Sequence, residues 1–363
     1  HPMKELPEDQ PHTLMYLAKE FIRENGKKGA QANEAGVGRK RPNVVLILAD
    51  DLGWVDLASY AARVRGVNRT ECYYETPNLD RLADRGLSFS QAYACPLCSP
   101  ARASILTGLY AARHGFLTAS GHTTGSYASR KMTPPEGYHI YDRKENEANK
   151  ANPALGYISP SFTYVLQSGQ DADSYDALTI PEALDGYRSA MAGKWHLGAL
   201  GVKGYQPQDQ GFGDVLAYHD HGGSHYFNWR KEWHKPGDDL GIDYLTDDLT
   251  ERAVRFIRDC AESAEPFFLY FPHFAVHGPR EAKPEDIDYF SKKPNRGWNG
   301  HSSSEYAGVL RGLDNSVGEI LDADVADDLW LCPQVAGDYE RAFHLVDPSD
   351  ANAVTACFTS AYG

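Results

Sequence analysis

The fold of this chain is decided by the run VVLILADD, residues 44–51. Six consecutive apolar residues of high β-propensity are typical of a central strand that is buried on both faces of a parallel sheet. The run ends abruptly at Asp50 and Asp51. Open α/β sheets bind ligands beyond the carboxyl ends of their strands, so these two carboxylates are candidates for holding a hard cation. A solvated strand end is the simpler alternative for the same two acids.

Further along the chain, apolar runs alternate with helical signals. Strands are predicted at 187–192 and 267–271, and helices at 76–86, 245–259 and 302–321. This alternation predicts an α/β fold, and the length fits one large domain. Asp314-Asn315 falls inside the last of these helices, not at a strand end, so we do not expect a metal site there.

Composition excludes several classes of partner. The 363 residues carry a formal net charge of -14, which argues against nucleic acid and anionic membrane surfaces as general partners. There is no apolar run of about 18 residues, so no membrane span is expected. Residues 1–40 form a polar stretch without the apolar core of a signal peptide, and we expect a flexible N-terminal extension.

The motif CPLCSPARASILTG, residues 95–108, changes abruptly from turn residues to helix formers. Cys98 therefore lies at a helix N-terminus, with Ser99 and Pro100 at the cap and first-turn positions. Such an N-terminus attracts anions, and Arg102 follows one turn later on the same face. A redox-active C-x-x-C pair of Cys95 and Cys98 is the alternative, but no thioredoxin-like context follows it.

A second polar motif, GKWHLG at residues 193–198, follows a predicted strand. If this segment is extended, Lys194 and His196 project to the same face and place a cation beside an acid/base group. A solvated Lys-x-His pair on the surface is the alternative interpretation.

Histidines cluster in two later segments. His277, between a strand exit and a Gly-Pro turn, is the better functional candidate, whereas His273 is expected to be structural. The aromatic-rich segment 211–233 contains three more, whose spacing suits pocket lining or a hydrogen-bonded loop better than a metal site: His219, His221 and His225.

Together these segments resemble the type I sulfatase family of the alkaline-phosphatase-like superfamily, from about Arg41 to Leu321. Residues 98–102 follow the family's C-x-P-x-R signature, and the acid pair, residues 193–196 and residues 277–279 match in the family's order. The resemblance implies an alkaline-phosphatase-like fold with a large, mostly parallel central sheet and helices on both faces. It also implies an arylsulfatase-like enzyme that hydrolyses a sulfate ester.

In this family the signature directs oxidation of the cysteine to formylglycine by a maturation enzyme. The resemblance therefore implies that Cys98 is the precursor of the nucleophile, an aldehyde hydrate that attacks sulfur and regenerates after sulfate leaves. It also implies a Ca²⁺ ion held by Asp50, Asp51 and residue 98.

The resemblance gives the basic residues roles as well. Arg102 and Lys194 would neutralise the sulfate and position the nucleophile. His196 would hold or deprotonate the hydrate, and His277 would serve the leaving oxygen. The substrate implied is a sulfated carbohydrate or an aryl sulfate, and the location implied is periplasmic or secreted.

The resemblance stops near Leu321. We expect a catalytic domain at 41–321 and a divergent tail at 322–363, which lacks the family's Asp-Asn-Gly motif. The smaller C-terminal subdomain is expected to be missing, through truncation or a frame shift, and the calcium site to be weak. Two other functions stay open: a phosphomonoester or phosphonate hydrolase of the same superfamily, and a non-catalytic remnant that binds sulfated glycans.

Overall fold

A computed structural model describes most of the chain between residues 41 and 323. The described residues are 41–86, 88–89, 92–111, 178–197, 206–219, 223–231, 233, 237–263, 265–294 and 297–323, with the backbone of 139–140, 157–158 and 354–359. Among these residues, no helix combines the length and apolar character that crossing a membrane requires.

A five-stranded parallel sheet forms the centre of the fold, in the order β5-β4-β6-β1-β7. Its strands are β1 (Val44–Ala49), β4 (Arg188–Lys194), β5 (Asp214–His219), β6 (Phe267–Pro272) and β7 (Val354–Thr359). A separate two-stranded sheet pairs β2 (His139–Ile140) with β3 (Tyr157–Ile158). The predicted parallel sheet is therefore confirmed, and the carboxyl ends of its strands lie at one edge.

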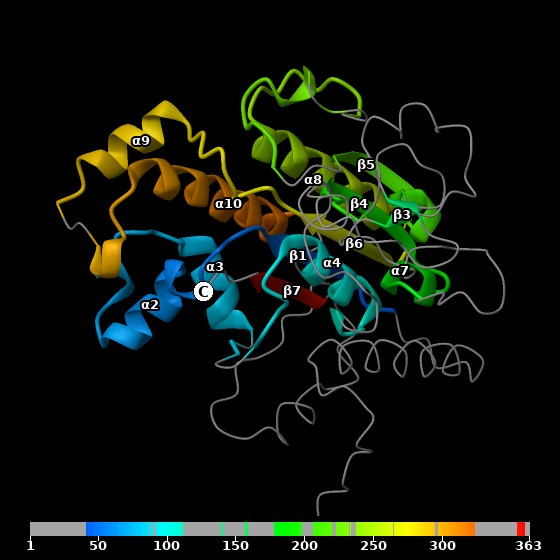
Figure 1. Ribbon diagram of the computed structural model, residues 1–363, viewed down its shortest axis with the longest axis horizontal. Coiled ribbons are helices and arrows are strands. Elements are labelled where there is room, and N and C mark those ends of the chain that lie inside the picture. The colour runs from blue at the N-terminus through cyan, green and yellow to red at the C-terminus, as the bar shows by residue number, and fades with distance from the viewer. Residues whose placement is uncertain are drawn as a thin grey trace, which may run out of the picture.

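Both faces of the sheet are buried. Along β1, Val45 and Ile47 belong to one apolar cluster, whereas Leu46 and Leu48 belong to the other. Successive side chains of a strand point to opposite faces, so an unbroken apolar run is what two buried faces require. One cluster takes in α8 (Leu245–Ser263) and α10 (Ser304–Asp322), and the other takes in α4 (Cys98–Thr107) and α7 (Ile180–Ala183). Figure 1 shows α8 and α10 above β6 and α7 below it.

The remaining helices surround this core. They are η1 (Trp54–Asp56), α2 (Ala58–Arg65), η2 (Arg69–Glu71), α3 (Pro77–Arg85), η5 (Pro207–Gln210), η6 (Trp229–Lys231), α9 (Pro284–Ser291) and η7 (Trp298–Gly300). The predicted helices at 76–86, 245–259 and 302–321 correspond to α3, α8 and α10 and are confirmed to within a few residues.

Asp314, inside α10, is hydrogen-bonded to another helix. Its carboxylate accepts the backbone N–H groups of Asn78, at 3.0 Å, and of Leu79, at 2.8 Å. These belong to the first turn of α3, where N–H groups have no partner within the helix. Asp314 is thus a cap supplied by a distant helix, and it ties α10 to α3.

The tail contains an element that sequence reasoning missed. Residues Val354–Thr359 form β7, which pairs in parallel with β1 over Val44–Ala49. The segment VTACFT is β-prone but too short to stand out from periodicity alone. The proposed boundaries at 41, 321 and 363, and the expected absence of a C-terminal subdomain, stay predictions because residues 324–353 lie outside the described part of the chain.

Candidate functional site

Three strands and one helix bring the predicted site residues to the carboxyl edge of the sheet. Asp50 and Asp51 follow β1, Lys194 ends β4, and Cys98 begins α4. The exit of β6 is bonded directly to the acid pair: Asp50 N–H donates to the Ala275 carbonyl at 2.9 Å. The Asp50 carbonyl in turn accepts from another residue of that exit at 2.7 Å. The exits of β1 and β6 are therefore joined by two backbone hydrogen bonds.

Asp50 is the centre of a buried ion cluster. Its carboxylate accepts a hydrogen bond from Lys194 Nζ, and its Oδ1 lies 3.3 Å from Arg102 Nη2. All three side chains are at most 1% exposed. Burial by itself would raise the pKa of Asp50, but the charges of Lys194, Arg102 and His277 outweigh it and lower that pKa, so the carboxylate is ionised.

Arg102 links the helix to both strands. Nη1 donates to the Lys194 carbonyl at 2.8 Å while Nη2 faces Asp50. Burial would lower the pKa of Arg102, but Asp50, with smaller effects from Tyr270 and Cys98, raises it, so the guanidinium stays charged. The influence of Cys98 on Arg102 agrees with their separation of one helical turn.

The helix that contains Cys98 begins two residues earlier than we expected. The N-cap of α4 is Leu97, Cys98 is the first helical residue, and Ser99 is buried inside the first turn. The cap assignment of Ser99 is therefore wrong, while Pro100 does lie in the first turn. Leu97 makes no side-chain hydrogen bond as a cap, so its side chain does not compete with an anion for the first turn of the helix near residue 98.

The two cysteines of the C-x-x-C spacing are free thiols. Cys95 Sγ lies 3.4 Å from Ser104 Oγ, and Cys98 is partly exposed. The structure thus contains both thiols in the reduced form, with Cys95 in contact with the helix that Cys98 begins.

Lys194 and His196 are not a solvated surface pair, because they are 0% and 1% exposed. The geometric premise of their pairing is wrong, however. β4 ends at Lys194, and His196 has a positive φ of 55°, so the segment is not extended through both residues. Lys194 joins the Asp50 cluster, whereas His196 is buried beyond the end of the strand.

Gly193 explains how β4 reaches this cluster. It has φ +127°, and a Cβ at this position would overlap the backbone carbonyl of Pro272. Only glycine combines that backbone conformation with so close an approach. β4 and the end of β6 therefore pack tightly at Gly193, next to the residue whose side chain contacts Asp50.

His277 faces the second acid. Nε2 lies 3.5 Å from Asp51 Oδ2, and both side chains are 31% exposed. Asp51 has a left-handed backbone, φ 57°, and burial together with the charge of Asp50 raises its pKa. By contrast His273 is buried, burial lowers its pKa to about 3, and its Nε2 lies 3.4 Å from Ser316 Oγ. His273 is thus a buried side chain, and the functional role of His277 stays a prediction.

The two described histidines of segment 211–233 differ in position: His225 lies in a loop, whereas His219 is the last residue of β5. His225 Nδ1 lies 2.7 Å from Glu281 Oε1, and His219 packs beside Trp233 with ring centroids 5.4 Å apart. His221 lies outside the described residues.

The turn after the acid pair depends on Asp56, which sequence reasoning did not single out. Its carboxylate accepts from Gly53 N at 3.1 Å and Tyr306 Oη at 2.5 Å, and His301 Nε2 lies 3.1 Å away. The local signal was an acid three residues after a glycine, and its partner in α10 is 250 positions away in the sequence. Asp56 thus connects the loop of Asp50 and Asp51 to α10.

A calcium ion suits these donors in kind but not in number. Calcium takes about six to eight oxygen ligands. The described residues contain no group of three or more His, Cys, Asp or Glu side chains arranged to hold a metal, and Asp50 already contacts Lys194 and Arg102. The described residues thus offer only part of the ligand set that a calcium ion takes.

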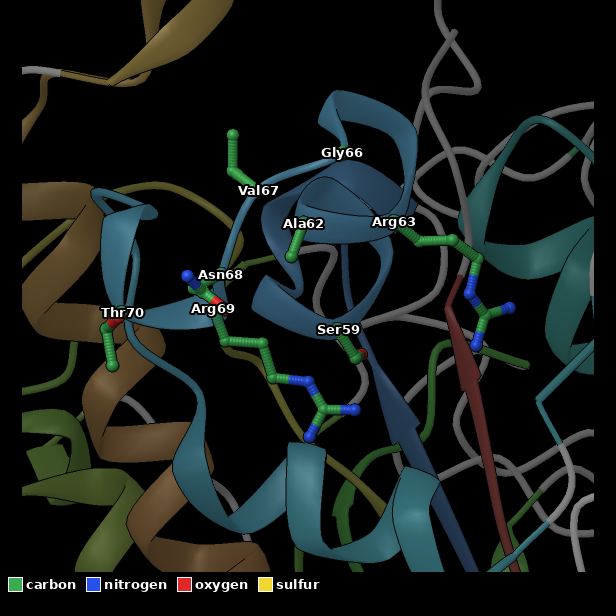
Figure 2. Close-up of a pocket in the computed structure, with 8 residues that line it drawn as sticks. All are labelled: Ser59, Ala62, Arg63, Gly66, Val67, Asn68, Arg69 and Thr70. Atoms are coloured by element: carbon green, nitrogen blue, oxygen red, sulfur yellow. The ribbon is translucent and has the colours of Figure 1, made fainter.

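A cavity of about 650 Å³ lies elsewhere, between α2 and η2 (Figure 2). Arg63 and Arg69 are among its lining residues, but Arg69 Nη2 is held by Asp84 Oδ1 at 2.6 Å. None of the predicted site residues lines this cavity. It is separate from the ion cluster of Asp50.

Comparisons with known proteins agree with this arrangement. The sulfatase family profile matches residues 42–139 and 159–327. A sulfatase of Formosa agariphila is 30% identical, over 78% of this chain and 53% of that protein. The N-acetylgalactosamine-6-sulfatase of Canis lupus familiaris is also 30% identical, over 77% of this chain and 46% of that protein. The chain thus spans about half the length of the curated relatives it matches.

A solved structure gives the same result for the fold. The crystal structure of Ps i-CgsB is 26% identical with a TM-score of 0.52, and the match covers 78% of this chain and 55% of that one. With the family profile matching most of the chain, and with the C-x-P-x-R cysteine, the acid pair and two buried cations at one edge of the sheet, the chain belongs to the sulfatase family.

Proposed function

We propose that this chain hydrolyses a sulfate ester, with residue 98 as the nucleophile after oxidation of Cys98 to formylglycine. One observation carries the proposal: Asp50, Arg102 and Lys194 come from three separate elements and meet, buried, beside the helix that begins at Cys98. Burying two cations beside one carboxylate carries a desolvation penalty that hydrophobic side chains would avoid, so such a cluster is more typical of a functional site than of a stabilising core.

The charge balance of the cluster supports an anionic substrate. The two acids, Asp50 and Asp51, are balanced by two basic side chains, Arg102 and Lys194, so a sulfate ester would meet no net negative charge here although the chain as a whole is acidic. The N-terminal end of α4 adds a further favourable partial charge. Arg102 and Lys194 would bind the sulfate oxygens and stabilise the charge that develops on them.

Each remaining residue has a proposed task. A hydrated aldehyde at residue 98 would supply one hydroxyl as the nucleophile. Its second hydroxyl then loses a proton as sulfate departs, which leaves the aldehyde, and water hydrates it again. His277 presents Nε2 toward Asp51 and would give a proton to the leaving oxygen. His196 would hold or deprotonate the hydrate. Asp50, Asp51 and residue 98 would provide the ligands for Ca²⁺ that lie within the described residues.

A sulfated carbohydrate is the proposed class of substrate. The support comes from the N-acetylgalactosamine-6-sulfatases among the relatives, whose name gives a sulfated sugar as substrate. An aryl sulfate would serve as a simple probe of the same chemistry, and a formylglycine-generating enzyme would be the partner required for maturation.

Mass spectrometry of the peptide that carries residue 98 tests the proposal most directly. We expect an aldehyde in protein from a host with the maturation enzyme, and release of 4-nitrophenol from 4-nitrophenyl sulfate in preference to 4-nitrophenyl phosphate. The Cys98→Ala variant is expected to bind sulfate but to release no product. An intact thiol in every molecule from such a host, or faster phosphate release, would overturn the proposal.

A further inference from the structure

The His277 ring is held in one orientation by its neighbour. Nδ1 lies 2.7 Å from the Gly278 carbonyl oxygen. A carbonyl oxygen only accepts hydrogen bonds, so Nδ1 carries the proton of this bond. The other ring nitrogen, Nε2, lies 3.5 Å from Asp51 Oδ2. The bond to Gly278 therefore directs Nε2 to the acid pair.

Gly223 packs against both partners of that bond. A Cβ at this position would lie 2.8 Å from the Gly278 carbonyl oxygen, 3.1 Å from His277 Nδ1 and 3.2 Å from its Cε1. These separations are shorter than ordinary van der Waals contact, so even a methyl group would displace the carbonyl or the ring. Gly223 does not have a positive φ, and the close approach alone excludes a side chain.

Tyr226 holds the backbone of the same turn. Its hydroxyl lies 3.0 Å from the Phe274 carbonyl and 2.9 Å from the His277 carbonyl, and its side chain is fully buried. A single hydroxyl proton is thus shared between two carbonyl groups on either side of the turn. Removing the hydroxyl would take this donor away from both carbonyl groups, and water could not readily replace it because the site is buried.

Glu281 contacts the same segment through its carboxylate. Its carboxylate accepts from Tyr226 N at 2.8 Å and lies 2.7 Å from His225 Nδ1. Hydrogen bonds to these groups lower the pKa of Glu281 despite the opposing effect of burial, so the carboxylate is ionised. The segment from Gly223 to Tyr226 is thus joined to residues 274–281 through the Tyr226 hydroxyl and through the Glu281 carboxylate.

We propose that Gly223 and Tyr226 are positioning residues that hold His277 Nε2 where it protonates the leaving oxygen. This inference rests on the proposed function of the chain as a sulfate ester hydrolase. As the bond between sulfur and the leaving oxygen breaks, the proton passes from Nε2 to that oxygen, and solvent returns a proton to the ring. Nδ1 stays bonded to Gly278 throughout.

Proton delivery matters most when the leaving group is a poor one. A 4-nitrophenolate leaves readily without being protonated, whereas the departure of an unsubstituted phenolate depends more strongly on protonation. Misplacing Nε2 should therefore slow phenyl sulfate hydrolysis more than 4-nitrophenyl sulfate hydrolysis. A loss of general acid catalysis is worth about 10²–10⁴ in rate, and a misplaced acid loses part of it.

The experiment measures kcat on phenyl sulfate and 4-nitrophenyl sulfate for Gly223→Ala and Tyr226→Phe. We expect each variant to lose about tenfold more kcat on phenyl sulfate than on 4-nitrophenyl sulfate. Gly213→Ala is the matched control, since its Cβ would meet only the Ser189 carbonyl at 3.8 Å. Tyr244→Phe is the second control, because it removes a buried hydroxyl from the ring that stacks on Tyr226 and keeps the ring itself. Each control variant should change kcat by the same factor on phenyl sulfate and on 4-nitrophenyl sulfate.

A readout without substrate separates this inference from the proposed function. The ¹⁵N spectrum of the His277 ring should show a proton on Nδ1 in the wild-type protein and an altered environment of that ring in Gly223→Ala. Gly223→Ala also carries the test if Tyr226→Phe does not fold. Equal losses on both substrates together with an unchanged ring spectrum overturn the positioning role. A wild-type protein that cleaves neither sulfate ester overturns the proposed function instead. In that case the ¹⁵N spectrum still reports whether Gly223 fixes the orientation of the His277 ring.

Discussion

Lys194 and Asp50 form a buried ion pair, although β6 lies between the strands that carry them. The pair joins the end of β4 to the end of β1 and is completed by Arg102 from α4. Since all three side chains are out of water, the stability of this edge depends on every member being present.

Removing Asp50 and Lys194 together should therefore cost less than the sum of removing each one alone. Lys194→Met leaves the Asp50 carboxylate short of a partner, and we expect a loss of about 3–5 kcal/mol in the free energy of unfolding. The double variant Asp50→Asn/Lys194→Met should lose less than the sum of the two single variants. Urea unfolding of all four proteins gives the coupling energy, and strictly additive losses would contradict a buried ion pair.

Gly193→Ala tests the close approach of β4 to β6. The variant combines an unfavourable φ of +127° with overlap of the Pro272 carbonyl. Gly66→Ala is the matched comparison, since Gly66 has φ +66° and a Cβ added there would meet no neighbouring atom within 4 Å. We expect Gly66→Ala to cost about 1–2 kcal/mol through backbone strain alone, and Gly193→Ala clearly more. Similar unfolding midpoints in the two variants would argue against the contact.

Asp314 should make stability depend on pH between about 4 and 6. Burial raises its pKa to about 6 from a usual value of 3.8, so the folded chain binds the proton more tightly than the unfolded chain. The resulting stability is fully present below pH 3.8 and is lost as the pH rises through 6. The two values differ enough to change the free energy of unfolding by about 2 to 3 kcal/mol.

The Asp314→Asn variant provides the reference for this effect. Urea unfolding at several pH values should show the wild-type protein losing stability relative to the variant from pH 4 to 6, with a constant difference above pH 7. A difference that does not vary with pH would show that Asp314 titrates equally in both states.

Calcium should bind this chain weakly. The acid pair offers few oxygens, and one of its carboxylates already pairs with Lys194, so a calcium ion must compete with that contact. We expect a Kd weaker than about 10⁻⁴ M by calorimetric titration, in the range of the weakest protein sites. Asp51→Asn should remove binding, whereas Asp288→Asn, in an exposed ion pair on α9, should not alter it. Binding at micromolar concentration would require ligands beyond the described residues.

Several elements were predictable because their signals are local. The apolar run of β1, the proline that begins α3 and the stripe along α10 each report burial or a helix start through the local sequence. The helix that begins at Cys98 and the spacing to Arg102 follow from the same rules. The acid pair could be assigned to a ligand-binding edge because β1 ends there.

Other parts of the site have no local signal. His196 was expected to share a face with Lys194, but a positive φ turns the chain at the end of β4. The contacts of Gly223 and Tyr226 with the His277 turn lie within an aromatic segment whose pattern only indicates burial.

The sequence by itself indicated the candidate site residues and which segments are buried. Only the tertiary structure decided which of them meet: Asp50 with Lys194, 144 positions apart, and Asp314 with Asn78, 236 positions apart. The physical reason is that periodicity records how each segment contacts water and its own neighbours. The order of strands in the sheet, which brings β4, β6 and β1 side by side, depends instead on how all the buried faces pack together.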